Sequence, residues 1–208
     1  MTTIEYVEPL TNTATRPERY AAGRVLRAKA SRTSHGEWAA VLDRPDPISL
    51  LEEENRTRVP ELVPIRFGRM SLSPFAFLRG SAAVMANDLA HTPVSGIQAQ
   101  LCGDAHMSNF GFFATPERNL VFDVNDFDET LPGPWEWDLK RLAASIVVAG
   151  RQNGYTAQEN RQAVVGCVEE YHGMMRRLSS MGALEVWYQH LDIGQILELA
   201  KTKGREEL

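Results

Sequence analysis

The sequence predicts an α+β protein that is mainly helical and carries one small β-hairpin. Several segments repeat apolar residues at helical spacing, whereas only two short runs have the composition of strands. At 208 residues and 43% hydrophobic content, the chain is long enough to bury a core in one domain or one and a half. We expect a flexible arm over residues 1–16, which lack periodicity, and a domain over residues 17–208.

Charge, cysteines and hydropathy argue against several classes of function. The chain carries 22 basic and 27 acidic residues, a net charge of -5, without the cluster of Lys and Arg that nucleic-acid binding needs. Cys102 and Cys167 lack partners at zinc-site spacing, so we expect two reduced, buried thiols. The start does not resemble a signal peptide, and the longest strongly apolar run, residues 142–149, is too short to cross a bilayer. We therefore expect a cytoplasmic protein without a membrane or nucleic-acid partner.

The N-terminal third is predicted to be helical with several breaks. Pro17 suits the first turn of a helix through residues 18–30, whose basic end complements the helix dipole. A short helix is predicted from about Ile48, followed by a break at Pro60 and another short segment.

The middle of the chain changes its period. Phe75 and Phe77 alternate, which predicts a short extended piece, and helical spacing then predicts a helix over about residues 80–91. The runs "GIQAQLCGD" and "NLVFDVND" are predicted to be two strands, paired as a hairpin across a turn rich in Phe and Gly. Both strands end at a cluster of acidic residues.

Long helices are predicted to follow. The apolar face of a helix over "WEWDLKRLAASIVVAGRQNG" consists of Trp137, Leu142, Ile146 and Ala149. Thr156 and Glu159 form a capping box at the start of the next helix. The core-facing residues predicted for that helix are Val164, Cys167, Val168, Tyr171 and Met175. A last amphipathic segment is predicted over about residues 183–203, where the domain is expected to be interrupted.

The predicted hairpin carries the residues that point to chemistry. Phosphoryl transfer from a nucleotide needs a carboxylate that orients the acceptor hydroxyl and two further oxygen ligands that hold Mg²⁺ against the phosphates. Protein kinases use an Asp, an Asn five residues later, and a second Asp at the end of a following strand. Asp104, Asn109 and Asp126 have this order and spacing. We therefore predict that Asp104 is the base and that Asn109 and Asp126 hold metal.

Neighbouring residues have supporting roles in this hypothesis. Asp128 could add a second-metal or water-mediated ligand, and His106 joins Asp104 as a candidate catalytic residue that braces the loop rather than taking the proton. Asp138, in the first turn of a predicted helix, is placed to cap that helix or to accept hydrogen bonds from loop amides. Arg79 lies between apolar residues, so it either pairs with a buried carboxylate or binds a phosphate of the cofactor.

A purely structural explanation of these residues stays open. Gly-Asp after a strand is a common turn, and Asn109-Phe-Gly111 could be another. The run "NDFDE" could be a solvated loop that caps the next helix, because short acidic motifs match by chance in many sequences.

The sequence also resembles a known family. The segments "LLEEENRTRVPELVPIRFGRMSLSPFAFLRGSAAVMANDLA", "LCGDAHMSNFGFFATPERNLVFDVNDFDETLPGPWEWDLKRLAAS" and "EVWYQHLD" resemble the N-terminal half of the bacterial domain of unknown function 2252 (DUF2252) family, from about residue 17 onward. That family is in turn similar to the kinase-like superfamily that includes aminoglycoside and choline phosphotransferases. The resemblance implies a kinase-like catalytic lobe.

The superfamily motifs match this sequence residue by residue. The loop His-Gly-Asp-x-His-x-x-Asn is matched by residues 102–109, with Cys102 in place of the first His. A metal strand such as Val-Ile-Asp-Phe-Asp is matched by residues 124–128, and the Asp of a Tyr-Asp-Leu motif is matched by Asp138. The resemblance implies ATP and Mg²⁺ as cofactors, and a small molecule or protein with a hydroxyl group as the acceptor.

The resemblance also predicts a missing part. A kinase would carry a Gly-rich phosphate loop and a strand Lys upstream of Asp104, and the sequence there has neither. Longer members of the family carry candidates for both downstream of the matching region. We therefore expect an incomplete lobe that binds nucleotide weakly and needs a C-terminal half or a partner chain.

Two other functions are compatible with the sequence. A metal-dependent phosphoesterase is one, because Asp104-x-His106 resembles the first ligand pair of binuclear metallophosphatases, although the further ligand motifs of that fold are not found. The other is a kinase-like module that binds a partner or nucleotide without turnover.

Overall fold

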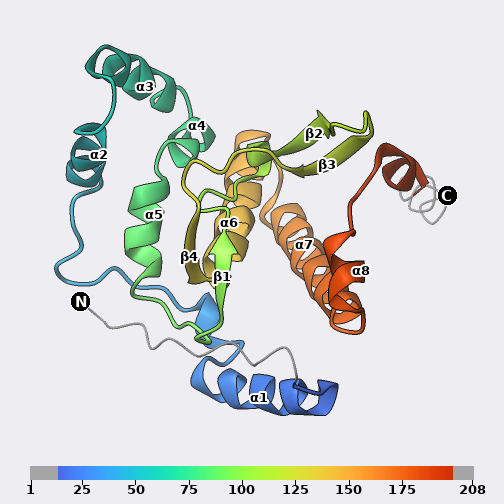
Figure 1. The fold of residues 1–208 in the computed structure, drawn as a ribbon. Helices are drawn as coiled ribbons and strands as arrows, with labels where there is room; N and C mark the ends of the chain where they lie inside the picture. The colour runs from blue at the N-terminus through green and yellow to red at the C-terminus, as the bar shows by residue number, and fades with distance from the viewer. Residues whose placement is uncertain (1–13, 199–208) are drawn as a thin grey trace.

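A computed structural model describes residues 14–198 of the chain and confirms a mixed α+β architecture that is mainly helical. Four short strands lie among the helices of this part (Figure 1). The predicted arm, residues 1–16, lies outside the described residues except for its last three. Arg16 already begins the first helix.

The N-terminal helices begin where the sequence predicts. Thr15 and Glu18 form a capping box in front of α1, which has Pro17 in its first turn. Asp46 caps α2 by accepting a hydrogen bond from the Ser49 N–H at 2.9 Å. The elements of this part are α1 (Arg16–Lys29), η1 (Ser34–Gly36), α2 (Pro47–Asn55), η2 (Pro60–Leu62) and α3 (Val63–Met70).

The extended piece predicted around Phe75 is wrong, because these residues form helix α4 (Pro74–Arg79). Ser73 caps this helix by accepting from the Ala76 N–H at 3.1 Å, and Pro74 occupies its first turn. These start signals outweigh the alternation of two Phe residues, which is too short to define a period. The helix predicted next is confirmed as α5 (Ala82–Leu89).

The predicted hairpin pairing is also wrong, because the two strands belong to different sheets. Strand β1 (Gln98–Leu101) pairs antiparallel with β4 (Leu131–Pro134). The sequence of β4 contains two prolines, which are typical of a loop. Two-stranded sheets have free edges, where proline is tolerated because no ladder N–H is needed. Figure 1 shows this pair beside α6.

The second sheet is a true hairpin between β2 (Phe110–Ala114) and β3 (Leu120–Val124). The predicted Phe- and Gly-rich turn is therefore strand β2, in which Phe112 stands opposite Phe122 with ring centroids 5.1 Å apart. The turn itself lies over residues 115–119, where Arg118 has a positive φ of 66°.

Helix α6 (Glu136–Gln152) is confirmed, but its most deeply buried side chains are polar rather than apolar. Glu136, Arg141 and Ser145 are buried, whereas the predicted apolar face is only half-buried. Near its end, Gly150 touches the next helix so closely that an added Cβ would lie 2.0 Å from Oδ1 of Asn160. Asn160 is 5% exposed, and its Nδ2 donates to the carbonyls of Tyr155 and Thr156.

Helix α7 (Ala157–Leu178) begins with the predicted capping box but does not bury the predicted face. Val168, Tyr171 and Met175 are exposed, and Val164 and Cys167 are half-buried. The helix packs on α6, and the Tyr171 ring stacks on Trp135 with the ring centroids 5.8 Å apart.

The amphipathic segment predicted over residues 183–203 is broken in two. Helix α8 (Ala183–Trp187) ends before a bridge between Val121 and Asp192, and a second short helix covers residues 193–198. Residues beyond 198 lie outside the described part.

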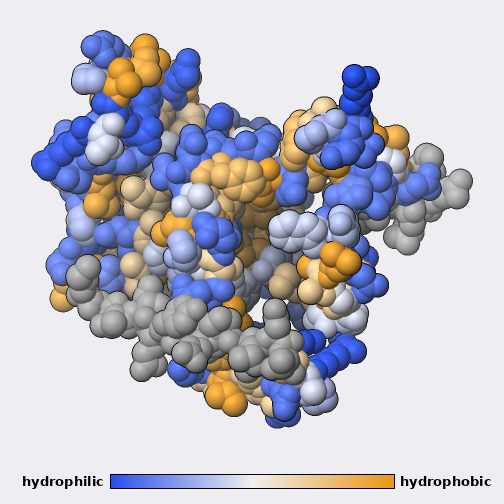
Figure 2. All heavy atoms as spheres, viewed as in Figure 1, coloured by the Kyte–Doolittle hydropathy of each residue, from blue (hydrophilic) through white to orange (hydrophobic). Residues whose placement is uncertain are grey.

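The main apolar cluster is small and contains no residue of α6. Leu51, Met70 and Val84 pack together between α2, α3 and α5, with Leu50 and Phe67 against them. Among residues 14–198, nine hydrophobic residues are buried, and seven polar or charged residues are buried as well. Figure 2 shows a surface on which hydrophobic and hydrophilic residues are mixed. The buried residues are therefore almost as often polar or charged as hydrophobic.

Within residues 14–198, no helix is both long enough and apolar enough to cross a membrane. Both cysteines are free thiols, as predicted, although Cys167 is only half-buried.

Candidate functional site

The hairpin end brings two of the predicted metal ligands to neighbouring backbone positions. Phe110, the first residue of β2, pairs with Val124, the last residue of β3. The ladder continues with a hydrogen bond from the Asn125 N–H to the Asn109 carbonyl at 3.0 Å. Asn109 and Asp126 therefore flank one end of the same hairpin, because the strand that precedes Asp126 pairs with the strand that follows Asn109.

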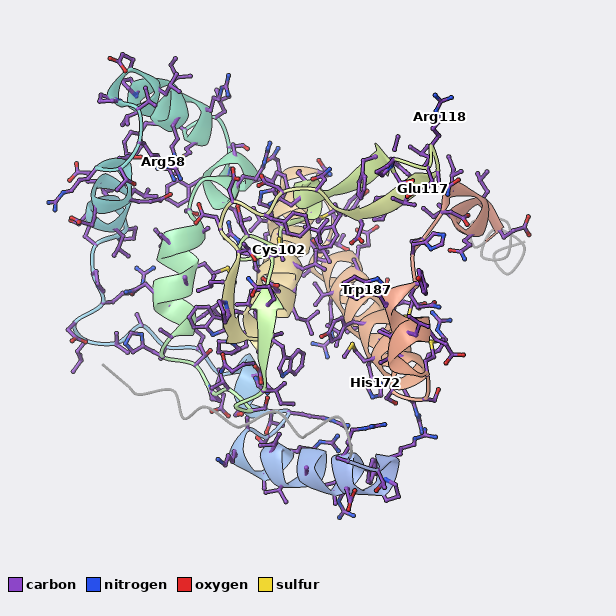
Figure 3. The ribbon with its side chains drawn as sticks, viewed as in Figure 1. Arg58, Cys102, Glu117, Arg118, His172 and Trp187 are labelled. Carbon is purple, nitrogen blue, oxygen red and sulfur yellow. The ribbon has the colours of Figure 1, made fainter. Side chains whose placement is uncertain are left out.

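The Asp104 turn packs directly on the loop after β3. Gly103 has φ +88°, and an added Cβ would lie 1.9 Å from the Glu129 carbonyl oxygen. Only glycine fits this close approach. The Cys102 thiol donates to the Asp126 carbonyl at 3.5 Å, and Cys102 is labelled near the centre of Figure 3. Burial raises the pKa of that thiol, so it stays protonated.

Asp138 holds the same turn from the start of α6. Its carboxylate accepts from the N–H groups of Cys102 at 2.7 Å and Gly103 at 3.1 Å. This is the second of the two placements that the sequence allowed. Burial raises the pKa of the Asp138 carboxyl, and the two amide hydrogen bonds oppose that shift.

Two residues that sequence reasoning missed extend this contact along α6. Arg141 donates through Nε to Asp104 Oδ1 at 2.7 Å, and Ser145 accepts from the Met107 N–H at 3.0 Å. Asp138, Arg141 and Ser145 follow the spacing i, i+3 and i+7, so they share one face of the helix. The signal was present as two polar residues at helical spacing inside "WDLKRLAAS".

The Asp104 and His106 side chains face each other inside the protein. His106 is 2% exposed, and its Nε2 lies 3.5 Å from Asp104 Oδ2, which is long for a hydrogen bond. Within the described residues, its Nδ1 is buried without a partner. Burial lowers the pKa of His106, Arg141 and Arg79 lower it further, and Asp104 opposes them. The imidazole is therefore neutral at pH 7.

Asn109 fixes the loop and keeps an oxygen for a ligand. It is 6% exposed, and its Nδ2 donates to the Asp104 carbonyl at 2.7 Å. The amide oxygen makes no hydrogen bond to the part of the chain that is described. Asp126 and Asp128 are exposed, and the Asp126 carboxylate accepts from the Asp128 N–H at 3.3 Å. Oxygen donors of this kind fit Mg²⁺.

The metal site is not complete from these side chains alone. Across residues 14–198, no group of three or more His, Cys, Asp and Glu side chains is arranged to hold a metal ion. The candidate set consists of Asn109 Oδ1, Asp126 and Asp128, so a bound cation would need phosphate or water oxygens as well.

Arg79 does not form the buried ion pair that was one of its two predicted roles. It is exposed at the end of α4, and no ion pair or hydrogen bond of its side chain occurs within residues 14–198. Phe75, one turn earlier, meets the His106 ring edge-on at 6.3 Å, so this side of α4 faces the site. The half-buried carboxylate of Asp104 is paired by Arg141 instead.

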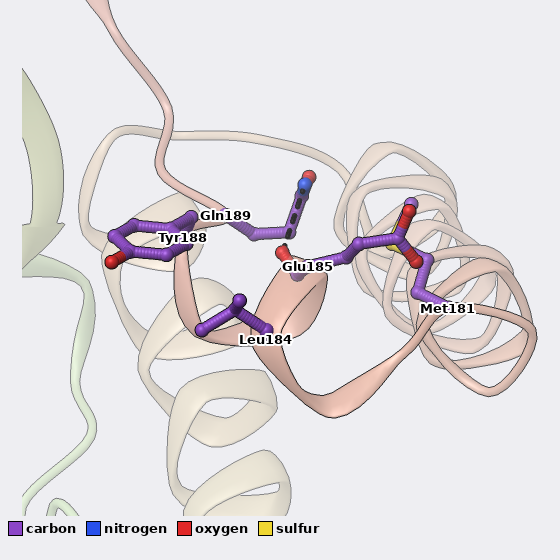
Figure 4. A pocket seen from close by; sticks show the side chains of 5 residues that line it. All are labelled: Met181, Leu184, Glu185, Tyr188 and Gln189. Atoms are coloured by element: carbon purple, nitrogen blue, oxygen red, sulfur yellow. Dashed lines mark hydrogen bonds between the residues drawn. The ribbon is translucent and has the colours of Figure 1, made fainter.

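A groove elsewhere on the molecule contains none of these residues. It encloses about 380 Å³ and is lined by Met181, Leu184, Glu185, Tyr188 and Gln189 around α8 (Figure 4). The Gln189 side chain donates to the Glu185 carbonyl at 3.3 Å across it. Its lining is mostly apolar and supplies no ligand for the predicted chemistry.

Comparison with known proteins identifies the family. Residues 58–208 match the family described as "Uncharacterized protein conserved in bacteria (DUF2252)". The chain belongs to the DUF2252 family. No curated protein and no solved structure matches it. All the candidate residues of the loop, the hairpin and α6 lie within the part of the chain that matches DUF2252.

Proposed function

We propose that this DUF2252 protein contributes the acceptor- and metal-binding part of an ATP- and Mg²⁺-dependent phosphotransferase. The observation that carries the proposal is that the Asp104 turn, one end of the β2–β3 hairpin and the start of α6 meet. Asp138 binds the amides of the Asp104 turn, and Asn109 and Asp126 flank the adjoining hairpin end. A site for phosphoryl transfer needs this combination of one oriented carboxylate and nearby oxygen ligands.

Each residue has one role in the proposal. Asn109 Oδ1 and the Asp126 carboxylate would hold Mg²⁺, with Asp128 as an additional ligand. When bound, Mg²⁺ neutralises charge on the phosphates of ATP. Arg79, exposed and unpaired within the described residues, adds a positive charge for those phosphates at the rim of the site. Asp104 accepts the hydrogen bond of the acceptor hydroxyl and orients it.

The first test is Mg²⁺-dependent stabilisation by ATP. We expect millimolar ATP with Mg²⁺ to raise the melting temperature, because a ligand at ten times its Kd stabilises the folded state by ~1.4 kcal/mol. Asp126→Asn should abolish this rise. Asp123→Asn is the matched control, because Asp123 is an exposed carboxylate of the same hairpin, and within residues 14–198 it accepts a hydrogen bond only from its neighbour's N–H.

The same assay separates the proposed function from its alternatives. Asp104→Asn should keep the stabilisation by ATP but lose transfer of the γ-phosphate, because Asp104 contacts the acceptor rather than the metal. Stabilisation without transfer in the unchanged protein would indicate a binding module. Stabilisation by Mn²⁺ with hydrolysis of a phosphoester would indicate a phosphoesterase, and no response to either would refute the proposal.

A further inference from the structure

Arg141 is a buried guanidinium with a partner for each of its nitrogens. It is 3% exposed and lies on the second turn of α6. Nε donates to Asp104 Oδ1, Nη2 donates to the Leu78 carbonyl, and Nη1 points to the Met85 sulfur at 3.5 Å. Contacts from α4 and α5 therefore hold the guanidinium independently of its contact with Asp104. Its orientation does not depend on the Asp104 turn alone.

Both close contacts between Arg141 and Asp104 fall on one carboxylate oxygen. Nε and Nη2 each lie 2.7 Å from Oδ1. The other oxygen, Oδ2, lies 3.5 Å from His106 Nε2. The two oxygens of Asp104 are therefore not equivalent. Oδ1 accepts from Arg141, whereas the contact of Oδ2 with His106 is long for a hydrogen bond.

We infer that Arg141 is a positioning residue that determines which oxygen of Asp104 meets the acceptor. It holds Oδ1 toward the interior, so Oδ2 is the oxygen that accepts the hydroxyl hydrogen. This inference rests on the proposed phosphotransferase function. It assigns Arg141 an action through Asp104, without contact to nucleotide or metal.

A purely structural ion pair would have different requirements. A lysine at position 141 keeps the positive charge, so it would satisfy a pair that serves stability alone. It cannot reproduce the planar fork that binds Oδ1 and the Leu78 carbonyl together. Loss of orientation with retained charge therefore separates the two explanations, because small misplacements of a reacting group lower rates by about 100-fold.

The test uses Mg²⁺-ATP with water as the acceptor. In this reaction the water oxygen bonds to the γ-phosphorus as the bond to ADP breaks, and the water proton passes to solvent after being oriented by Asp104. For Arg141→Lys we expect kcat to fall about 100-fold while KM for Mg²⁺-ATP stays within about twofold. Arg44→Lys is the control, because Arg44 makes a similar fork with Asp88 at 2.6 and 2.9 Å outside the site.

A second measurement does not require turnover or a folded variant at position 141. The Arg141 Nε–H should exchange slowly with solvent in ¹H–¹⁵N spectra of the unchanged protein, and Asp104→Asn should shift its resonance. Rapid exchange would overturn the contact. Equal kcat in Arg141→Lys and the unchanged enzyme would overturn the inference alone. Absence of both Mg²⁺-ATP binding and hydrolysis in the unchanged protein would overturn the proposed function, and the inference with it.

Discussion

At the scale of single residues, the site depends on positions whose surroundings determine which residue fits and which charge it carries. Gly103 combines a positive φ with a backbone oxygen in the place of a side chain. His106 is neutral because it is buried beside two arginines. Neither property can be read from one sequence, since both depend on atoms that come from distant parts of the chain.

Gly103→Ala should destabilise the protein by about 3 kcal/mol. The left-handed backbone costs an alanine ~1 kcal/mol, and displacement of the Glu129 backbone adds ~2 kcal/mol. The matched control is Gly154→Ala, which has φ +80° but no atom within 4 Å of the added Cβ. Urea denaturation of both variants checks the difference, and equal losses of stability would contradict the close contact at Gly103.

Acidification should destabilise the protein in part through His106. Its pKa in the folded protein lies below its ordinary value of 6.5, so the unfolded chain takes up the proton first as the pH falls. The neutral histidine therefore contributes stability that is present above pH 6.5 and is lost as the pH falls toward the folded pKa.

The measurement is the free energy of unfolding in urea at pH 7.5 and pH 5.5. His106→Asn should reduce the loss of stability between the two values. Burial also lowers the pKa of His35, so His35→Asn measures that separate share. An unchanged loss in His106→Asn would show that this imidazole does not titrate differently on folding.

At the scale of elements, α6 is the support of the predicted site. Sequence reasoning identified this helix and Asp138, because capping and periodicity are local properties. It missed Arg141 and Ser145 because it assigned α6 an apolar inner face. It also mispaired the strands. The pairing of β1 with β4 joins residues about 30 positions apart, and a short run that contains prolines gives no sequence signal of such a pairing. The order of Asp104, Asn109 and Asp126 was readable, whereas the element that holds Asp104 was not.

Ser145→Ala should loosen the loop that precedes Asn109. The side chain is fully buried and accepts from the Met107 N–H, so its removal leaves that donor without a partner at a cost of ~1–2 kcal/mol. Hydrogen exchange at the Met107 amide should become faster. Ser180→Ala, which removes an exposed hydroxyl on the turn after α7, should change neither stability nor this amide. Unchanged protection at Met107 would argue against the support by α6.

At the scale of the whole molecule, the apolar cluster of Leu51, Met70 and Val84 lies at a different junction of elements from the candidate site, which has buried apolar residues of its own in Leu101 and Ala105. The core lies between α2, α3 and α5, and the site lies between α6 and the two sheets. Composition predicted a core but could not place it, because amphipathic segments of similar length occur throughout the chain. Much of the face that was predicted to be core on α7 is exposed instead.

Leu51→Ala should therefore cost stability through packing alone. Leu51 is 0% exposed at the centre of the core, so we expect a loss of ~2–5 kcal/mol. Leu62→Ala is the control, because Leu62 is 57% exposed and should change stability by less than ~1 kcal/mol. Calorimetry measures both. Similar melting temperatures for the two variants would place the core elsewhere.

The contact between Gly150 and Asn160 has a consequence for motion. The Asn160 amide occupies the space that a side chain at position 150 would fill, so α6 and α7 approach each other closely at this point. We therefore expect the two longest helices of residues 14–198 to move together. We expect any opening or closing that accompanies ligand binding to arise in the turns beside this pair of helices. Asp138, Arg141 and Ser145 hold the turn at residues 102–107 to α6, whereas they make no contact with residues 125–130 among the described hydrogen bonds.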